Sequence, residues 1–189
     1  MALLPPDGTL DSCLSVASKE MAASSELENE VLSLFDQYRN RLLRYVLALG
    51  LTIHDGEEVV QEVFLSLFRH MQRGQPRHNL AGWLFRVTHN LALKQRSANR
   101  RLRDVMESDE DREKSDTSLN PEEAIVDRQR QERLLAVVRA LPQQDQLCLR
   151  LRAEGLRYRE IAGTLGISLG SVSNSLTRSL TRLQRADGR

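Results

Sequence analysis

Residues 154–178, EGLRYREIAGTLGISLGSVSNSLTR, carry two short helical patterns that meet at a glycine. Ile161, Ala162 and Leu165 give the first pattern an apolar face. Gly166 permits a tight turn, because a residue without Cβ tolerates a positive φ. Ser168 stands where a hydroxyl caps the N-terminus of the second helix. This layout is that of a helix-turn-helix.

The second helix of this motif is predicted to bury an apolar stripe made of Val172, Leu176, Leu180 and Leu183. The side chains left outward can all hydrogen-bond to a base edge or a phosphate: Ser171, Asn174, Thr177, Arg178 and Thr181. A helical hairpin inside an ordinary all-α core would show the same two patterns. The rest of the chain must therefore decide what the motif is for.

Composition and periodicity together predict an all-α protein. Only 4% of the 189 residues are aromatic, and 10 Gly and 5 Pro leave few turn signals. Helical spacing is expected at residues 27–49, 55–71 and 79–101, with Asp55 as the N-cap of the second of these helices. We expect two small helical domains joined by a flexible acidic linker. The segments are a disordered N-terminal extension at 1–25, a first domain at 26–103, a linker at 104–120 and a second domain at 121–186 that ends in the helix-turn-helix.

The net charge of +1 hides a strong segregation of sign. Residues 77–103 hold seven Lys or Arg and no acid, whereas residues 104–123 hold nine acids and two basic residues. On the helix expected at 79–101, the predicted core side is Leu80, Leu84, Val87, Leu91 and Ala98. The opposite stripe is Arg86, Asn90, Lys94, Ser97 and Arg101, flanked by His89, Arg96 and Arg100. An acid-free basic face favours a polyanionic partner over an ordinary solvated face. Trp83 and Phe85 lie near it, where an aromatic ring could stack on an exposed base.

The preceding helix has an acidic outer edge. Glu57, Glu58, Gln61 and Glu62 surround the exposed Leu65. A carboxylate metal site would need a Glu-x-x-His partner on a facing helix, and the sequence has none, so neither a metal nor a cofactor is predicted. An acidic patch with an apolar centre fits the docking of a basic protein.

Several function classes are disfavoured by the sequence. Cys13 and Cys148 lack metal-ligand spacing and read as reduced thiols of a cytoplasmic protein. No apolar run approaches the roughly 20 residues of a membrane span, so no membrane insertion is expected. His54-Asp55 is typical of some metal phosphohydrolases, but the other histidines lack acids at ligand spacing, and no enzyme or catalytic residue is predicted.

Three segments resemble one family when they are taken together. They are EEVVQEVFLSLF at 57–68, WLFRVTHNLA at 83–92, and the stretch from Leu141-Pro142 through the helix-turn-helix. In this order they resemble the extracytoplasmic-function subfamily of the sigma-70 family of bacterial RNA polymerase sigma factors, over about residues 27–186. The resemblance implies a factor that binds core polymerase through its β and β′ subunits and directs promoter recognition, DNA melting and transcription initiation at stress- or signal-responsive genes. It also implies promoter DNA as a partner and an anti-sigma factor as a candidate partner.

The resemblance implies a role for each surface. Docking on core polymerase falls to Glu57, Glu58, Gln61, Glu62, Phe64 and Leu65. Binding of the minus-ten element falls to Trp83, Arg86, Asn90, Lys94, Arg96, Arg100 and Arg101, with Asn90 near a flipped base. Binding of the minus-thirty-five element falls to Arg157, Ser171, Ser173, Asn174, Thr177, Arg178 and Arg182.

The chain departs from the family in the second helix of the motif. Family members carry two or three basic residues just after the position of Val172, where this chain has Ser173 and Ser175. Fewer phosphate contacts predict weaker and less salt-sensitive binding by this domain alone. The acidic linker is expected to occupy the RNA path of the polymerase at initiation. A stand-alone helix-turn-helix regulator is the alternative, although it leaves the acidic surface and the Trp83 helix unexplained.

Overall fold

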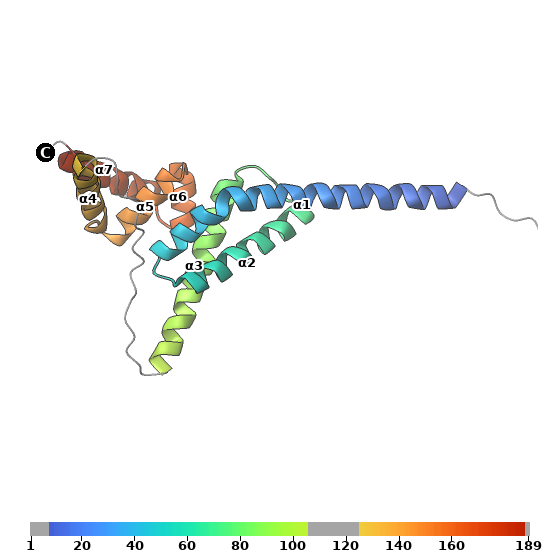
Figure 1. The fold of residues 1–189 in the computed structure, drawn as a ribbon, viewed down its shortest axis with the longest axis horizontal. Helices are drawn as coiled ribbons and strands as arrows, with labels where there is room; N and C mark the ends of the chain where they lie inside the picture. The colour runs from blue at the N-terminus through green and yellow to red at the C-terminus, as the bar shows by residue number, and fades with distance from the viewer. Residues whose placement is uncertain (1–7, 106–124, 188–189) are drawn as a thin grey trace, which may run out of the picture.

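The structure, a computed structural model, describes the backbone of residues 8–105 and 125–187 and the side chains of residues 24–101 and 130–187. The described residues form seven α-helices and no strand, which confirms the all-α class (Figure 1). Residues 106–120 of the expected linker lie outside the described part of the chain. The domain boundaries expected from the sequence therefore stay predictions.

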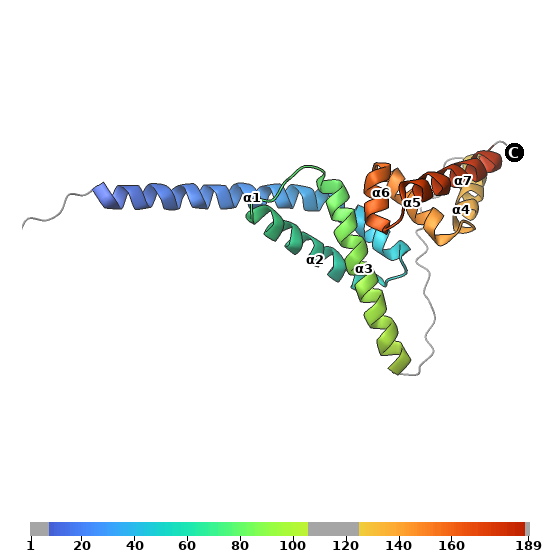
Figure 2. The ribbon, with the colours of Figure 1, turned by 180° about the vertical axis from the view of Figure 1, so that it is seen from behind.

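The first three helices form one packed unit. Helix α1 (Gly8–Ala48) and helix α2 (Ile53–Gln72) run in opposite directions, and helix α3 (Leu80–Val105) crosses them. The centre of this unit contains side chains that are inaccessible to solvent: Leu42, Val46, Val63, Leu67 and Leu84. In Figures 1 and 2 the C-terminal half of α3 projects beyond α1 and α2, so much of that half has no helix packed against it.

The beginnings of α1 and α2 both differ from the sequence-based expectation. Helix α1 begins at Gly8, so residues 8–25 are helical, and the expected disorder of residues 1–25 is wrong over that stretch. No proline or glycine interrupts residues 9–49, so nothing stops the helix from continuing toward the N-terminus. Thr52, and not Asp55, is the N-cap of α2. Its hydroxyl accepts a hydrogen bond from Asp55 N at 3.2 Å and donates one to Asp55 Oδ2 at 2.7 Å.

Asp55 instead links the start of α2 to α3. Gln95 Nε2 donates to Asp55 Oδ1 at 3.2 Å, and Asn99 Nδ2 donates to Asp55 Oδ2 at 3.0 Å. Burial alone would raise the pKa of Asp55, but the hydrogen bonds from Thr52, Gln95 and Asn99 together hold it below the ordinary value. The ionised carboxylate therefore stabilises the crossing of α3 over α2.

The second unit contains the helix-turn-helix. It comprises α4 (Ile125–Arg139), α5 (Gln143–Ala153), α6 (Tyr158–Leu165) and α7 (Leu169–Asp187). Gly166 ends α6 with φ of 66°, and Ser168 Oγ accepts a hydrogen bond from Ser171 N at 3.1 Å. The structure thus confirms the predicted turn and cap.

The buried face of α7 is not the leucine stripe that the sequence pattern predicted. Val172 and Leu176 are buried, but Leu180 is 49% exposed, so its placement in the core is wrong. Ser175 and Ser179 are buried in its place. Their small side chains let α5 lie against this side of α7.

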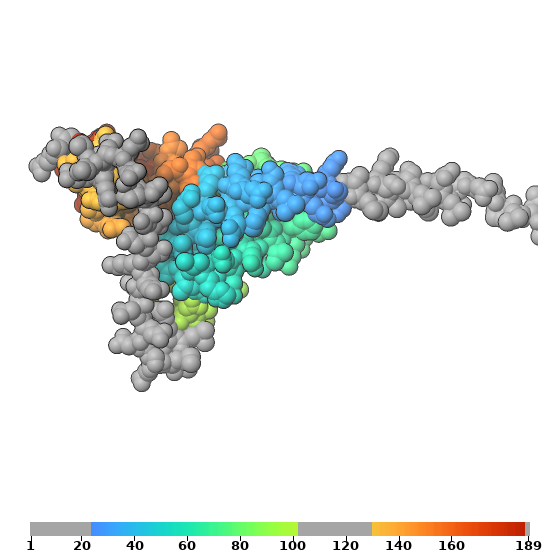
Figure 3. Space-filling model, viewed as in Figure 1, coloured from blue at the N-terminus to red at the C-terminus, as the bar shows by residue number. Residues whose placement is uncertain are grey.

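The two units share one continuous core through a seam between α6 and α3 (Figure 2). In Figure 3 the surface of the second unit adjoins that of the first. Arg41 of α1 crosses the seam: its Nε donates to Glu154 Oε2 at 2.5 Å and its Nη2 donates to Glu154 O at 2.8 Å. The same guanidinium lies over the Tyr38 ring at 4.7 Å. The buried Cys148 thiol of α5 lies close enough to Tyr45 of α1 to add to the effect of burial in raising the tyrosine pKa. Polar contacts at the rim and apolar contacts inside therefore hold the seam.

We predict that Arg41→Ala loosens this seam. The variant loses a charge-assisted pair and a hydrogen bond to a carbonyl, which we expect to cost about 1–2 kcal/mol. Small-angle scattering should show a larger radius of gyration, and thermal unfolding should begin earlier. Arg39→Ala is the matched control, because Arg39 pairs with Glu57 of the first unit at 3.3 Å and makes no hydrogen bond to the described part of the second unit. Equal effects of the two substitutions would contradict the assignment of Arg41 to the seam.

We predict that Asp55→Asn destabilises the protein in a pH-dependent way. Because the pKa of Asp55 is lowered on folding, its stabilisation is present above the unfolded pKa of about 4 and is lost as the pH falls through the folded pKa. At pH 7 the variant should lose about 1 kcal/mol of unfolding free energy. Denaturant titration from pH 7 to pH 3 should show the difference from the parent protein shrinking. A difference that stays constant with pH would contradict this prediction.

Candidate nucleic-acid interface

The basic stripe of α3 is fully presented to solvent. Its five members are all exposed: Arg86, Asn90, Lys94, Ser97 and Arg101. Arg96 and Arg100 on the flank are also exposed, and Arg96 additionally donates to Leu49 O at 3.3 Å. With no acid between residues 77 and 103, no carboxylate of α3 before Asp104 neutralises this stripe. The face can hold a phosphate backbone along about four helical turns.

Two aromatic residues expected near this stripe are core residues instead. Phe85 is fully buried, with its ring 5.5 Å from that of Tyr45. His89 is also buried, and its Nδ1 lies 2.9 Å from Tyr45 Oη. Burial, with a further contribution from Arg96, lowers the pKa of His89 and so favours the neutral ring. The sequence pattern missed this because α1 and α6 cover a side of α3 that looked open.

Trp83 lies at the edge of the stripe and is partly buried. Its ring packs against the imidazole of His70 at 4.8 Å between centroids, and His70 Nε2 lies 3.1 Å from Pro76 O. This packing fixes the orientation of the indole. Ala98, expected in the core, is exposed, because α3 faces α2 at this level through Gln95 and Asn99 instead.

The acidic surface of α2 is present as predicted, except for one residue. Gln61 and Glu62 are exposed. Leu65, which follows them on α2, is 52% exposed. Phe64 does not belong to this surface, because it is buried with its ring 4.9 Å from that of Phe35. Phe64 therefore supports the surface from beneath.

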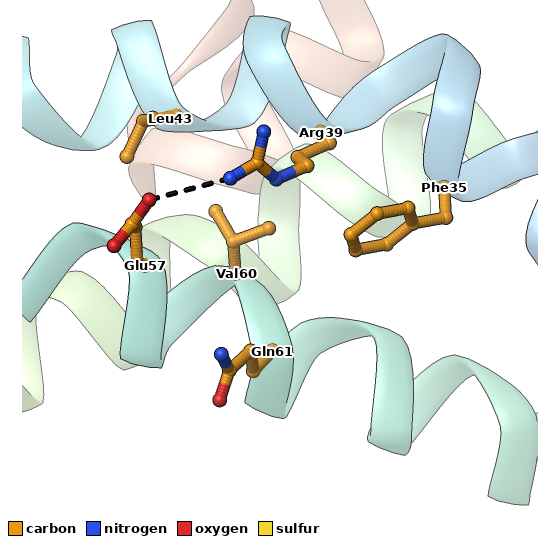
Figure 4. A pocket seen from close by; sticks show the side chains of 6 residues that line it. All are labelled: Phe35, Arg39, Leu43, Glu57, Val60 and Gln61. Atoms are coloured by element: carbon orange, nitrogen blue, oxygen red, sulfur yellow. Dashed lines mark hydrogen bonds and ion pairs between the residues drawn. The ribbon is translucent and has the colours of Figure 1, made fainter.

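A shallow groove of about 200 Å³ runs between α1 and α2 beside this surface (Figure 4). Its lining residues are Phe35, Arg39, Leu43, Glu57, Val60 and Gln61. Arg39 bridges the groove to Glu57 at 3.3 Å, while Glu58 pairs with His54 and Glu62 with Arg69. These pairs are exposed and hold their partners weakly. The carboxylates thus remain available to a basic partner.

The helix-turn-helix presents a largely uncharged polar face. Ser173, Asn174, Thr177 and Arg182 are exposed on α7. Ser171 is half-buried, with its hydroxyl 2.9 Å from that of Ser168. Arg157 is exposed at the start of α6.

Arg178 differs from its neighbours on α7 because it has a buried partner. Its Nε and Nη2 donate to the two carboxylate oxygens of Asp145 at 2.8 and 2.7 Å. The Arg178 hydrogen bonds hold the pKa of Asp145 below its ordinary value despite burial, and they raise the pKa of Arg178 in turn. Sequence reasoning missed Asp145, because acidic residues are common in the first turn of a helix, where they interact favourably with the helix dipole.

The described residues offer no group of three or more metal-ligating side chains. None of their helices is both long and apolar enough to span a bilayer.

Solved structures share this fold. The chain aligns with the sigma factor RpoE of Bartonella quintana, solved in complex with the anti-sigma factor NepR, with a TM-score of 0.62 and 16% identity over 85% of this chain and 96% of that one. It aligns with CnrH, solved with the cytosolic domain of CnrY, with a TM-score of 0.53 and 19% identity over 87% of this chain and 92% of that one. At these identities the likeness extends to the fold alone.

Sequence comparison identifies the family. Residues 34–102 match the model of sigma-70 region 2, and residues 131–183 match the model of sigma-70 region 4. The chain is 34% identical over 150 residues to the ECF RNA polymerase sigma factor SigE of Mycolicibacterium smegmatis, covering 78% of this chain but only 58% of that relative. It is 24% identical over 164 residues to the ECF RNA polymerase sigma factor EcfG of Rhodopseudomonas palustris, covering 86% of each. The chain therefore belongs to the extracytoplasmic-function subfamily of the sigma-70 family.

Proposed function

We propose that this chain is an RNA polymerase sigma factor that binds core polymerase and directs promoter recognition, melting and initiation at a stress- or signal-responsive set of genes. The observation that carries the proposal is the exposed, acid-free stripe of α3 around Asn90. A second DNA-reading helix, α7, and an acidic docking surface on α2 lie on the same chain. Family membership supports assigning these three surfaces to the minus-ten element, the minus-thirty-five element and the polymerase, respectively.

The α3 stripe suits the capture of a melted strand. A base can be read on its pairing edge only after it leaves the stack, which costs a few kcal/mol. Arg86, Lys94 and Arg101 lie on one side of α3 and can hold successive phosphates of the unpaired strand. Asn90 stands between them with donors and an acceptor for the extruded base. Trp83, held by His70, offers an aromatic surface at the start of the same face.

The acidic surface of α2 suits core polymerase. Glu57, Glu58 and Glu62 already hold basic side chains of this chain through exposed pairs, so basic groups of a β or β′ subunit can replace those partners at little cost. Leu65 offers an apolar contact within the acidic ring. The groove next to Gln61 adds a concave surface.

Contact with both promoter elements requires the seam to open. The centres of the minus-ten and minus-thirty-five elements are about 25 base pairs apart, which is roughly 85 Å of duplex at about 3.4 Å per base pair. In the structure α6 packs directly on α3, and α7 packs on α6. The two reading helices therefore cannot reach both elements until α6 leaves α3.

The proposed role includes no covalent step by this chain, which needs no cofactor and works in the cytoplasm with the polymerase. An anti-sigma factor is a proposed partner, because the sigma factor RpoE, which has a similar fold, was solved in complex with the anti-sigma factor NepR. The groove between α1 and α2 is a surface such a partner could share with the polymerase.

The proposal is tested by run-off transcription with purified core polymerase on fragmented genomic DNA. We expect discrete start sites that need both the chain and the core. A stand-alone regulator would instead bind specific DNA tightly without the polymerase. Such binding, together with the absence of any specific start, would overturn the proposal.

We predict that Asn90→Ala and Lys94→Ala impair promoter melting in different ways. Asn90→Ala should lower open-complex formation about tenfold on duplex DNA and much less on a template with a pre-melted bubble, because it removes a contact made only to the extruded base. Lys94→Ala should lower the salt slope of binding by about one, as expected for one phosphate contact. Permanganate footprinting and salt titration measure these effects. Arg69→Ala on α2 is the control and should change neither.

We predict that Leu65→Ala weakens core binding about tenfold, because a half-exposed leucine that becomes buried in a complex contributes about 1.5 kcal/mol. Leu135→Ala is the matched control, since Leu135 is 48% exposed and lies on α4 in the second unit. Fluorescence titration of labelled chain with core polymerase measures both affinities. Equal losses for the two leucines would remove Leu65 from the docking surface.

A further inference from the structure

The direction of α7 is set by a forked ion pair to α5. Arg178 donates through Nε and Nη2 to both oxygens of Asp145, at 2.8 and 2.7 Å. The Asp145 side chain is fully buried, while that of Arg178 is 53% exposed. A two-point contact between planar groups fixes orientation as well as distance. The pair can therefore control the angle at which α7 leaves α5.

Other contacts between α5 and α7 involve small hydroxyl groups. Gln144 Nε2 of α5 lies 3.5 Å from Ser175 Oγ of α7, whereas the Ser179 hydroxyl is bonded within α7, to Ser175 O at 2.7 Å. Buried serines contribute little apolar area. The buried apolar residues of α7, Val172 and Leu176, belong to its first half. Among its contacts with α5, the second half of α7 thus depends on the ion pair, while its C-terminal end is held to α4 by Arg130, which donates to both carboxylate oxygens of Asp187.

Arg178 cannot leave this pair without a penalty. If the guanidinium moved to a base, the carboxylate of Asp145 would remain buried without its two-point charged partner and would keep only the weaker influence of Ser175 and Arg182, which is unfavourable. The exposed side chains Ser173, Asn174 and Thr177 carry no such constraint. An asparagine amide can also make two hydrogen bonds to the N6 and N7 of adenine in the major groove.

On the basis of the proposed sigma-factor role, we propose that Arg178 stays on Asp145 when α7 lies on DNA and acts as a positioning residue. Base selection at the minus-thirty-five element then falls to Ser173, Asn174 and Thr177. The sequence pattern had grouped Arg178 with these side chains because it is also outward on α7. The structure separates it from them through a partner 33 residues earlier in the chain.

The first test is a double-mutant cycle with the full chain and core polymerase, on the promoter selected in the run-off assay. Asp145→Asn and Arg178→Gln should each weaken binding to the minus-thirty-five element about tenfold, and the double variant should be no weaker than either. If Arg178 contacted DNA directly, Asp145→Asn would free it and leave affinity unchanged or improved. That result, or additive losses, would overturn the inference.

The second test separates the effect of the two-point hydrogen bond of Arg178 from the effect of its positive charge. Arg178→Lys keeps the charge but cannot make the two-point contact, so it should behave like Arg178→Gln. A phosphate contact would survive in the lysine variant, and that outcome would overturn the inference. Arg157→Gln is the control, because Arg157 is exposed at the start of α6 and is not among the groups that shift the pKa of Asp145; it should lower the salt slope by about one and show no coupling to Asp145.

The third test separates positioning from mere loss of folding. All variants are compared at a temperature where circular dichroism shows full helicity, on templates with and without the minus-thirty-five element. Positioning variants should lose activity only on the template that has the minus-thirty-five element. Their loss of activity should be the same whichever base of the element is substituted. Asn174→Ala should lose discrimination at one base. A base-specific loss in Arg178→Gln would overturn the inference.

The outcomes also distinguish this inference from the proposed function. If the parent chain with core polymerase selects no start site, the sigma-factor role itself fails. If it selects start sites but the Asp145–Arg178 cycle is additive, only the positioning role of Arg178 fails.

Discussion

The packing of α3 against three other helices is the constraint on which the rest of the structure depends. Helices α1 and α2 cover one side of α3, and α6 covers a neighbouring side. Phe85, Thr88 and His89 are buried there, although two of the three are polar. What remains free is the strip from Arg86 to Arg101, which lacks acids. The contacts that complete the core therefore cover the other sides of α3, and the basic side stays exposed to a polyanion.

Charge pairing inside the fold explains why the reading faces stay basic or neutral. Asp55, Asp145 and Glu154 are each engaged by side chains of another helix, so these carboxylates stabilise helix crossings. The carboxylates of Glu58 and Glu62 at the surface of α2 pair with side chains of α2 itself, in exposed contacts. Structural acids are thus used where they fix geometry, and exposed acids are gathered where a basic protein can dock.

The parts of this architecture that follow local rules could be predicted from the sequence. The glycine turn at Gly166, the cap at Ser168 and the basic stripe around Asn90 each depend on neighbours within one helix or one turn. The wrong predictions concern residues whose burial depends on a helix that is distant in the sequence. His89 is buried because α1 approaches it, and Ser175 replaces Leu180 in the core because α5 lies on that side of α7. Arg178 looked like a free base reader because Asp145, 33 residues earlier, gives no periodic signal.

The free energy needed to open the seam between α3 and α6 connects the fold with the proposed function. A ligand shifts a conformational equilibrium only by its difference in affinity for the two states. The rim contact of Arg41 with Glu154 is about three-quarters buried and contributes on the order of 1–2 kcal/mol. Each 1.4 kcal/mol of seam stability requires about tenfold preferential binding to the open form. Core polymerase docks, in this proposal, on the α2 surface that the closed form already exposes, so docking there alone cannot open the seam. The opening must come from contacts that the separated α6–α7 unit makes with polymerase or DNA, and these contacts must offset the buried apolar contacts of the seam as well as its polar rim.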